Sequence, residues 1–207
     1  MFLRDIPYIA EDLTHLRAHD PVFAPLDIKN EYLPWHTFEH GFEGLVRVVQ
    51  SQQIAAKVAD MLWAKLKQAG QGAVSAEFVL SLSAEQLKPF GMSAQKTKYI
   101  QLLAHDVMNG TFDPAALQTL SNDEAMARIT TLKGFGPWSA QIYLMFCEQR
   151  RNILPAGDLV LDRAIQAMFD LPERPTYAVL QEMTQHWEGR YTAASLLCWA
   201  VYTRGLI

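Results

Sequence analysis

The sequence is short of cysteine, of charge and of long apolar runs, and each shortage excludes a class of protein. Its two cysteines, Cys147 and Cys198, form no CxxC pair, which argues against an iron–sulfur cluster or a structural zinc site. No apolar run approaches the ~20 residues that span a bilayer. Charges at Arg4, Asp5 and Glu11 interrupt the place where a signal peptide needs an apolar core. We therefore expect neither a membrane partner nor a leader.

The composition is that of a folded domain. Of 207 residues, 50% are hydrophobic and only 19% are charged, which excludes intrinsic disorder. The length suits one domain or two small subdomains. The formal net charge is -4, whereas a nucleic-acid-binding protein is typically basic. Bulk charge alone thus predicts against nucleic acid, and two free thiols suit a reducing cytoplasm.

Helical spacing dominates the chain. Apolar residues recur at intervals of three and four over 45–66, 99–107, 126–132, 140–147, 160–168, 180–187 and 193–201, which predicts eight to ten short helices. No long alternation of polar and apolar residues indicates a sheet. Gly70, Gly91 and the pair Asn109-Gly110 are placed as helix stops. The sequence predicts an all-α fold.

The segment Leu-Lys-Gly-Phe-Gly-Pro-Trp-Ser-Ala over 132–140 joins two amphipathic stretches. Gly134 and Gly136 permit a tight turn, and Pro137 suits a first helical turn. Free amides at that helix start make an anion site that fits a DNA phosphate. An ordinary helix–turn–helix corner explains the same residues, so the segment alone leaves both interpretations open.

Two aspartates follow in the segment Pro-Ala-Gly-Asp-Leu-Val-Leu-Asp-Arg-Ala-Ile over 155–165. Asp158 stands where an N-cap stands, and a helix N-terminus favours its negative charge. A carboxylate beside a cleft can also stabilise a cationic sugar transition state. Asp162, one turn later, is expected to be a surface residue paired with its neighbours.

Together these segments resemble the helix–hairpin–helix DNA glycosylase superfamily, and within it the 3-methyladenine DNA glycosylase II group. Three weaker segments agree: His-Asp-Pro-Val-Phe-Ala-Pro-Leu over 19–26, Val-Gln-Ser-Gln-Gln-Ile-Ala-Ala over 49–56, and Leu-Lys-Pro-Phe-Gly-Met-Ser-Ala-Gln-Lys over 87–96. The resemblance covers residues 13–203. It implies two helical subdomains, 41–150 and 1–40 plus 151–207, with the active site in the cleft between them.

The resemblance also implies roles for the hairpin and for Asp158. Asp158 would be the catalytic carboxylate, and the amides of Gly134, Phe135 and Gly136 would hold a phosphate. Nearby carbonyls would hold a monovalent cation; no side chain is expected to bind a metal, and no other cofactor is implied. Lys133 would be a phosphate contact or a solvated charge. Gln53 matches a position that fills the gap left by a flipped base, although such a Gln is otherwise a surface residue.

Residue 138 separates this chain from bifunctional relatives such as endonuclease III. They carry a lysine nucleophile there, and Trp138 cannot form a Schiff base. Candidate aromatics for the base pocket, each equally explained by core packing, are Trp138, Tyr143, Trp35 and Phe38. Two departures from the family bear on which bases are accepted. Arg190 stands where some relatives place an aromatic and Ile142 where others place tyrosine.

The implied function is a monomeric, monofunctional glycosylase that flips alkylated purines out of duplex DNA and hydrolyses the N-glycosidic bond. The alternatives are a same-fold glycosylase for other lesions, such as hypoxanthine or ethenoadenine or one with lyase activity, and a non-catalytic lesion-binding module. The protein would be cytoplasmic and nucleoid-associated, or nuclear in a eukaryote. Basic residues expected around the hairpin and its neighbouring turns are Lys96, Lys98, Arg128, Lys133, Arg150 and Arg151. With a net charge of -4, the footprint on DNA would be small and salt would weaken it only modestly.

Overall fold

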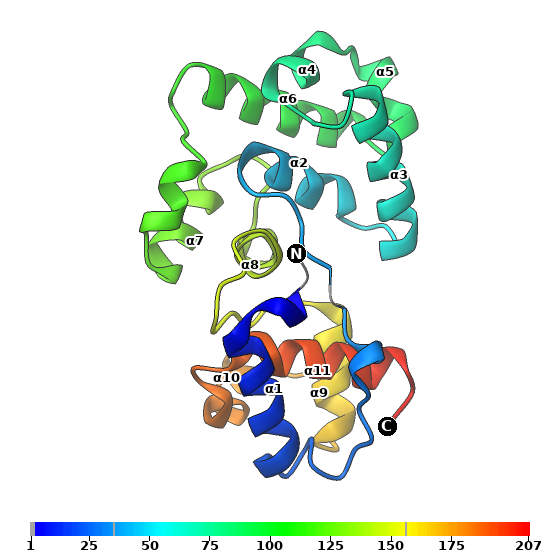
Figure 1. Ribbon diagram of the computed structural model, residues 1–207, viewed down its shortest axis with the longest axis vertical. Coiled ribbons are helices and arrows are strands. Elements are labelled where there is room, and N and C mark those ends of the chain that lie inside the picture. Colours follow the sequence, from blue (N-terminus) through cyan, green and yellow to red (C-terminus); the bar gives the residue numbers. More distant parts are fainter. Residues whose placement is uncertain (1–2, 35, 156) are drawn as a thin grey trace. The chain divides into compact units, whose positions relative to one another are not determined.

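The computed structural model describes residues 3–34, 36–155 and 157–207. Within these ranges the regular structure is helical and no strand is present (Figure 1), which confirms the all-α prediction. No helix there is long and apolar enough to cross a membrane. Packing divides the chain into a central unit, Phe38–Tyr143, and a terminal unit formed by Met1–Thr37 and Leu144–Ile207.

These limits lie near the 40/41 and 150/151 limits expected from the sequence. The second limit falls earlier than expected, before Leu144, and side-chain packing explains this. The ring of Phe146 stacks on Trp199 of the terminal unit, with centroids 5.6 Å apart. Tyr143, by contrast, bonds to Gly41 within the central unit, where the Gly41 amide donates to the Tyr143 hydroxyl at 3.0 Å.

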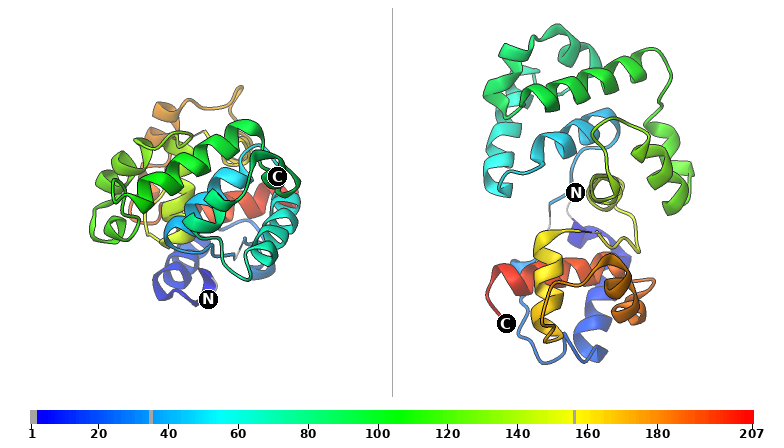
Figure 2. Two further views of the ribbon diagram at one scale, coloured as in Figure 1. Left: turned by 90° about the horizontal axis from the view of Figure 1, so that it is seen from above. Right: turned by 180° about the vertical axis from the view of Figure 1, so that it is seen from behind.

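The central unit is a bundle of short helices in which α6 lies beside α2 and α4, as both Figure 1 and Figure 2 show. Serine hydroxyls at Ser75, Ser83, Ser93 and Ser121 cap four of the helix starts, each supplying an acceptor that the first turn lacks. Its elements are α2 (Gly41–Ser51), α3 (Ala56–Ala69), α4 (Ala76–Ser81), α5 (Ala84–Leu87), η3 (Lys88–Phe90), α6 (Ala94–Met108), η4 (Ala115–Thr119), α7 (Asn122–Thr130) and α8 (Pro137–Ile142).

The expected helix stops lie where the sequence placed them. Gly70 is the C-cap of α3, and Gly91 ends η3 in the left-handed conformation with φ +81°. Asn109 ends α6 and Gly110 follows at φ +77°, so this pair ends a helix and turns no hairpin. A π-helical turn, Tyr143–Cys147 (η5), directly follows α8.

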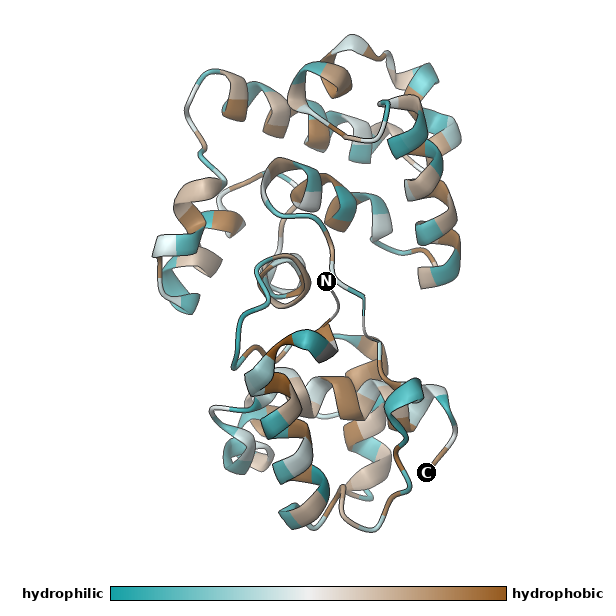
Figure 3. Ribbon diagram, viewed as in Figure 1, coloured by the Kyte–Doolittle hydropathy of each residue, from teal (hydrophilic) through white to brown (hydrophobic). Residues whose placement is uncertain are grey.

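The terminal unit is built around α11, which packs against α1 and α9. Figure 3 shows apolar residues along α9 and α11. Trp187 is fully buried there; its indole donates to Asp20 at 2.7 Å and its ring stacks on Phe23. The elements of this unit are η1 (Leu3–Asp5), α1 (Pro7–His19), η2 (Asn30–Tyr32), α9 (Leu159–Met168), α10 (Tyr177–Met183), η6 (Gln185–Trp187) and α11 (Tyr191–Thr203).

Candidate functional site

Asp158 is the N-cap of α9, as the sequence predicts. Its Oδ1 accepts hydrogen bonds from the amides of Val160 at 3.0 Å and Leu161 at 2.9 Å. The same oxygen accepts from the indole Nε1 of Trp199 at 2.9 Å. Gly157, at φ +71°, turns the chain into the helix. Three donors on one oxygen fix the orientation of this half-buried carboxylate, which is the precision that a reacting group requires.

Trp199 is a residue that the sequence analysis missed. It lies in α11, whose apolar stripe predicts only core packing. Its ring stacks on Phe146 with 24° between the ring planes, which leaves the indole N–H to reach Asp158. A tryptophan beside the apolar stripe of a helix is itself a signal, because an indole N–H that is withdrawn from water needs an acceptor.

Asp162 differs from the expectation of a surface residue: its side chain lies in the buried part of α9, only 8% exposed. Burial raises the pKa of Asp162, the Asp158 charge raises this pKa further, and Arg174 lowers it. The sequence interpretation failed because residue 162 shares its helical face with Asp158, one turn earlier, and that face points inward.

The turn between α7 and α8 requires glycine at residue 134, as the sequence predicts. Gly134 has φ +89°, and a Cβ added there would lie 2.2 Å from the Tyr99 ring, so both conformation and space demand glycine. Gly136 is the N-cap of α8 and offers no side-chain acceptor to the first turn. The Phe135 amide donates to Leu132 O at 3.2 Å. This corrects the expectation for Phe135: its amide is already used inside the turn.

Two adjacent glutamines, Gln52 and Gln53, follow α2, and their side chains have different surroundings. Gln53 is exposed and has φ +57°. The Gln52 carboxamide Nε2 instead donates to Gly134 O at 3.0 Å and to Ser139 Oγ at 2.9 Å. The resemblance assigns a DNA contact to Gln53, whereas the side chain that contacts the hairpin within the protein is that of Gln52.

The gathering of basic residues expected around the hairpin and its neighbouring turns stays a prediction, and four of its six members already hold partners within the protein. Lys96 donates to Gln50 O and Gln52 O, Arg128 to Thr111 O, Arg150 to Glu148, and Arg151 to Asp12. Arg150 and Arg151 also belong to the terminal unit. Lys133, beside the hairpin, is exposed, which fits either of its expected roles.

The four candidate pocket aromatics are placed differently, and their role stays a prediction. Trp138 is half-buried in the first turn of α8. Tyr143 is 1% exposed, which favours core packing. Phe38 is half-buried with the Arg47 guanidinium 4.2 Å from its ring centroid. Trp35 lies outside the described residues.

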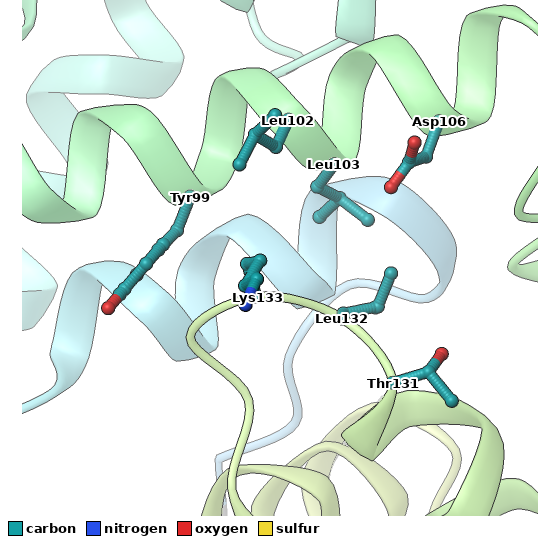
Figure 4. A pocket seen from close by; sticks show the side chains of 7 residues that line it. All are labelled: Tyr99, Leu102, Leu103, Asp106, Thr131, Leu132 and Lys133. Carbon is teal, nitrogen blue, oxygen red and sulfur yellow. The ribbon is translucent and has the colours of Figure 1, made fainter.

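A cavity of about 100 Å³ lies in the central unit beside the hairpin. Side chains of α6 line one side and the turn after α7 lines the other (Figure 4). Its lining residues are Tyr99, Leu102, Leu103, Asp106, Thr131, Leu132 and Lys133. It is smaller than the roughly 300–1,000 Å³ typical of ligand sites, and of the predicted pocket aromatics that the structure describes, none lines it. We do not assign it to the flipped base.

The two departures from the family also have a place. Arg190 lies with Nε 3.5 Å from Oδ1 of Asp12, a buried carboxylate that Arg151 also contacts. Arg190 and Arg151 therefore share one carboxylate within the terminal unit. Ile142 is a buried residue of α8. Among the described residues no group of three or more His, Cys, Asp or Glu side chains is arranged to hold a metal ion.

Comparison with known proteins places this geometry in a family. The chain is 27% identical over 161 residues to DNA-3-methyladenine glycosylase 1 of Schizosaccharomyces pombe, covering 76% of this chain and 71% of that one. It is 29% identical to the Bacillus subtilis protein YfjP over 59% of this chain, but that match spans only 43% of YfjP.

Solved structures agree on the fold. The Schizosaccharomyces pombe 3-methyladenine DNA glycosylase, determined in complex with abasic DNA, matches with a TM-score of 0.84 and 25% identity over 95% of this chain and 98% of that one. The 3-methyladenine DNA glycosylase of Archaeoglobus fulgidus matches with a TM-score of 0.74 over 94% of this chain and 69% of that one. The model of the HhH-GPD superfamily of base excision DNA repair proteins matches residues 46–188, and the chain therefore belongs to that superfamily.

Proposed function

We propose that the protein is a monofunctional DNA glycosylase that removes alkylated purines, of the 3-methyladenine and 7-methylguanine type, from duplex DNA. The observation that carries the proposal is Asp158, whose Oδ1 receives three hydrogen bonds at the start of α9 in a chain of the base excision superfamily. A carboxylate oriented in this way suits electrostatic stabilisation of a developing positive charge.

The chemistry follows from the substrate. Alkylation at N3 or N7 makes the purine cationic and weakens its bond to the sugar, so that departure needs little acid catalysis. The enzyme flips the nucleotide out of the stack. The bond from base nitrogen to C1′ then breaks with its electrons going to the base. Asp158 stabilises the oxocarbenium-like sugar, as carboxylates do in glycoside cleavage. Water adds at C1′, loses a proton, and leaves an abasic site.

Residue 138 supports cleavage without lyase activity. A lyase reaction needs an amine that attacks the sugar carbon and forms a Schiff base. Trp138 has no amine, so no covalent DNA adduct is expected to be trapped by borohydride. The product is then an intact strand with an abasic site.

The hairpin is proposed to hold a phosphate of the damaged strand. The Gly136 amide and the first turn of α8 would donate to it, and Lys133 would add a charge. Because the Phe135 amide bonds to Leu132, it is not part of this proposal. A monovalent cation at hairpin carbonyls would add positive charge beside the phosphate. Gln53, exposed at its loop, would fill the gap that the flipped base leaves.

The pairing of Arg190 bears on the lesion. An unpaired arginine near the base would repel a cationic purine, but Arg190 lies beside the buried Asp12 carboxylate. The Asp12 carboxylate, which Arg151 also contacts, offsets part of that positive charge. Neutral lesions such as hypoxanthine and ethenoadenine stay the alternative. We further propose a monomer that acts in a reducing compartment, consistent with Cys147 and Cys198 being buried and forming no disulfide.

The test is base release from duplexes carrying 3-methyladenine, 7-methylguanine, ethenoadenine or hypoxanthine. The wild type should release the first two fastest. Asp158→Asn should reduce single-turnover release about 10²–10³-fold, the range for loss of one transition-state-stabilising group. The fold should survive, because asparagine is also a good N-cap.

The matched control is Asp170→Asn, which makes the same charge change at the exposed far end of α9. It should release bases at the wild-type rate. Equal release by Asp158→Asn would remove the mechanism. Tight binding of abasic DNA by a wild type that releases no base would favour a lesion-binding module instead.

A further inference from the structure

The loop after α2, residues 52–55, is held by hydrogen bonds from α6. The Lys96 ammonium donates to Gln50 O at 2.8 Å and Gln52 O at 2.7 Å. The last carbonyls of a helix have no partner within it, and a cation at this end also opposes the negative end of the helix dipole. Burial lowers the pKa of Lys96. A partly buried ammonium is tolerated only when it is well bonded, so these contacts fix both partners.

The same loop is joined to the hairpin by one side chain. The Gln52 carboxamide nitrogen donates to Gly134 O and to Ser139 Oγ, and its two hydrogens can satisfy both acceptors. Gly134 O belongs to the peptide between Gly134 and Phe135, so this contact fixes the plane of the central peptide of the turn. Ser139 is in the first turn of α8 and is only 4% exposed.

A third contact holds the end of α2 itself. Gln50 is fully buried, and its Nε2 donates at 3.3 Å to Ala59 O of α3 and to Phe90 O of η3. The loop is thereby fixed to α3, η3, α6 and the hairpin, all within the central unit. Gln53 is exposed in this framework at φ +57°. A non-glycine residue keeps such a conformation when its surroundings determine it.

We propose that Gln52 and Lys96 are positioning residues that hold the loop 52–55 and the hairpin in one fixed geometry, so that phosphate binding and insertion of Gln53 occur together. Neither side chain needs to touch the DNA. This inference rests on the proposed function, because it assigns the two residues a role in how Gln53 and the hairpin meet a damaged duplex. A framework formed before binding spares the entropy of ordering the loop on the DNA.

A double-mutant cycle tests the coupling. Binding is measured by fluorescence anisotropy on a duplex with a tetrahydrofuran abasic-site analogue and on the undamaged duplex. In the wild-type background, Gln53→Ala should weaken binding to the abasic duplex about fivefold. In the Gln52→Ala background the same change should weaken it less than about twofold, because residues in one network show non-additive effects. Undamaged duplex has no gap, so Gln53→Ala should leave its affinity unchanged.

Gln101→Ala is the matched control, because Gln101 also donates from Nε2 to a backbone carbonyl of the central unit, Leu82 O at 3.2 Å, away from the loop. In this background the fivefold effect of Gln53→Ala should persist. A purely structural role for Gln52 predicts the same effect of Gln53→Ala in all three backgrounds, and that result would overturn the proposal.

Lys96 gives a second arm that does not depend on Gln52→Ala folding. Lys96→Met should also reduce the effect of Gln53→Ala on the abasic duplex to under about twofold, whereas Lys96→Arg, which keeps donors for both carbonyls, should restore about fivefold. An unchanged effect in Lys96→Met rejects the proposal. Wild-type protein that releases no base from the damaged duplexes rejects the proposed function itself, and that outcome is distinct from base release without coupling.

Discussion

The starts of α8 and α9 solve the same problem in opposite ways. Each helix begins with amides that have no acceptor within the helix. At α9 the cap is Asp158, whose carboxylate accepts from two of those amides. At α8 the cap is Gly136, which has no side chain to accept anything. One helix start thus carries its own anion, and the other, in the proposed function, receives a phosphate from outside.

The difference teaches what each region depends on. The hairpin depends on backbone shape, which Gly134 permits and the Tyr99 ring confines. The Asp158 region depends on a charge and on the donors around it. Adding atoms should therefore damage the first region, and removing donors or charges should alter the second.

The largest effect is expected from Gly134→Ala. The new Cβ would lie 2.2 Å from the Tyr99 ring at a φ of +89°. Left-handed strain costs about 1–2 kcal/mol and overpacking adds about 1–3 kcal/mol. We expect the free energy of unfolding, measured in urea, to fall by about 2–5 kcal/mol, with a loss of DNA affinity.

A glycine without crowding separates the two causes. Gly110 has φ +77°, and a Cβ there would meet nothing within 4 Å. Gly110→Ala should lose only the strain, about 1–2 kcal/mol. Combining Gly134→Ala with Tyr99→Ala should cost less than the sum of the two single changes. Equal losses at Gly134 and Gly110 would show that the ring does not confine the turn.

An intermediate effect is expected from Trp199→Phe. The change keeps a ring to stack on Phe146 but removes the indole donor to Asp158. A hydrogen bond to a charged group contributes about 1.5–3 kcal/mol, part of which should appear as slower chemistry. We expect about tenfold slower single-turnover base release, because 1.4 kcal/mol corresponds to a factor of ten.

Trp187→Phe is the control, because Trp187 makes the corresponding bond to Asp20 in the same unit. It should lower the melting temperature but leave the rate of base release unchanged below that temperature. A wild-type rate in Trp199→Phe would reduce its bond with Asp158 to a structural contact.

The sequence was a good guide to the parts of this molecule that local chemistry determines. Conformational preferences of single residues account for the helix stops at Gly70 and Gly91, the turn at Gly134 and the cap at Asp158. Each can be predicted because neighbours in the chain decide it.

Contacts between distant residues could not be predicted in this way. Nothing near Lys96 in the sequence shows that it caps α2, and nothing near Arg151 shows that it pairs with Asp12. The expected basic cluster counted charges without the partners that four of them hold. Trp199 was missed because its helix reads as core, and only the tertiary fold brings its indole to Asp158.

The smallest effect is expected from Asp162→Asn, and its sign sharpens the contrast between the two helix starts. The pKa of Asp162 is raised by burial and by Asp158, so the folded chain binds this proton more tightly than the unfolded chain. By linkage, Asp162 then destabilises the fold at pH 7, and this penalty disappears as the pH falls through the raised pKa toward the ordinary value. Asp162→Asn should therefore raise the urea midpoint slightly at pH 7, with a gain that shrinks on acidification. Asp27→Asn, at an exposed loop position of the same unit, should show neither change. A midpoint lowered at pH 7 would mean that Asp162 accepts hydrogen bonds that outweigh its burial, and that α9, unlike α8, depends on two carboxylates.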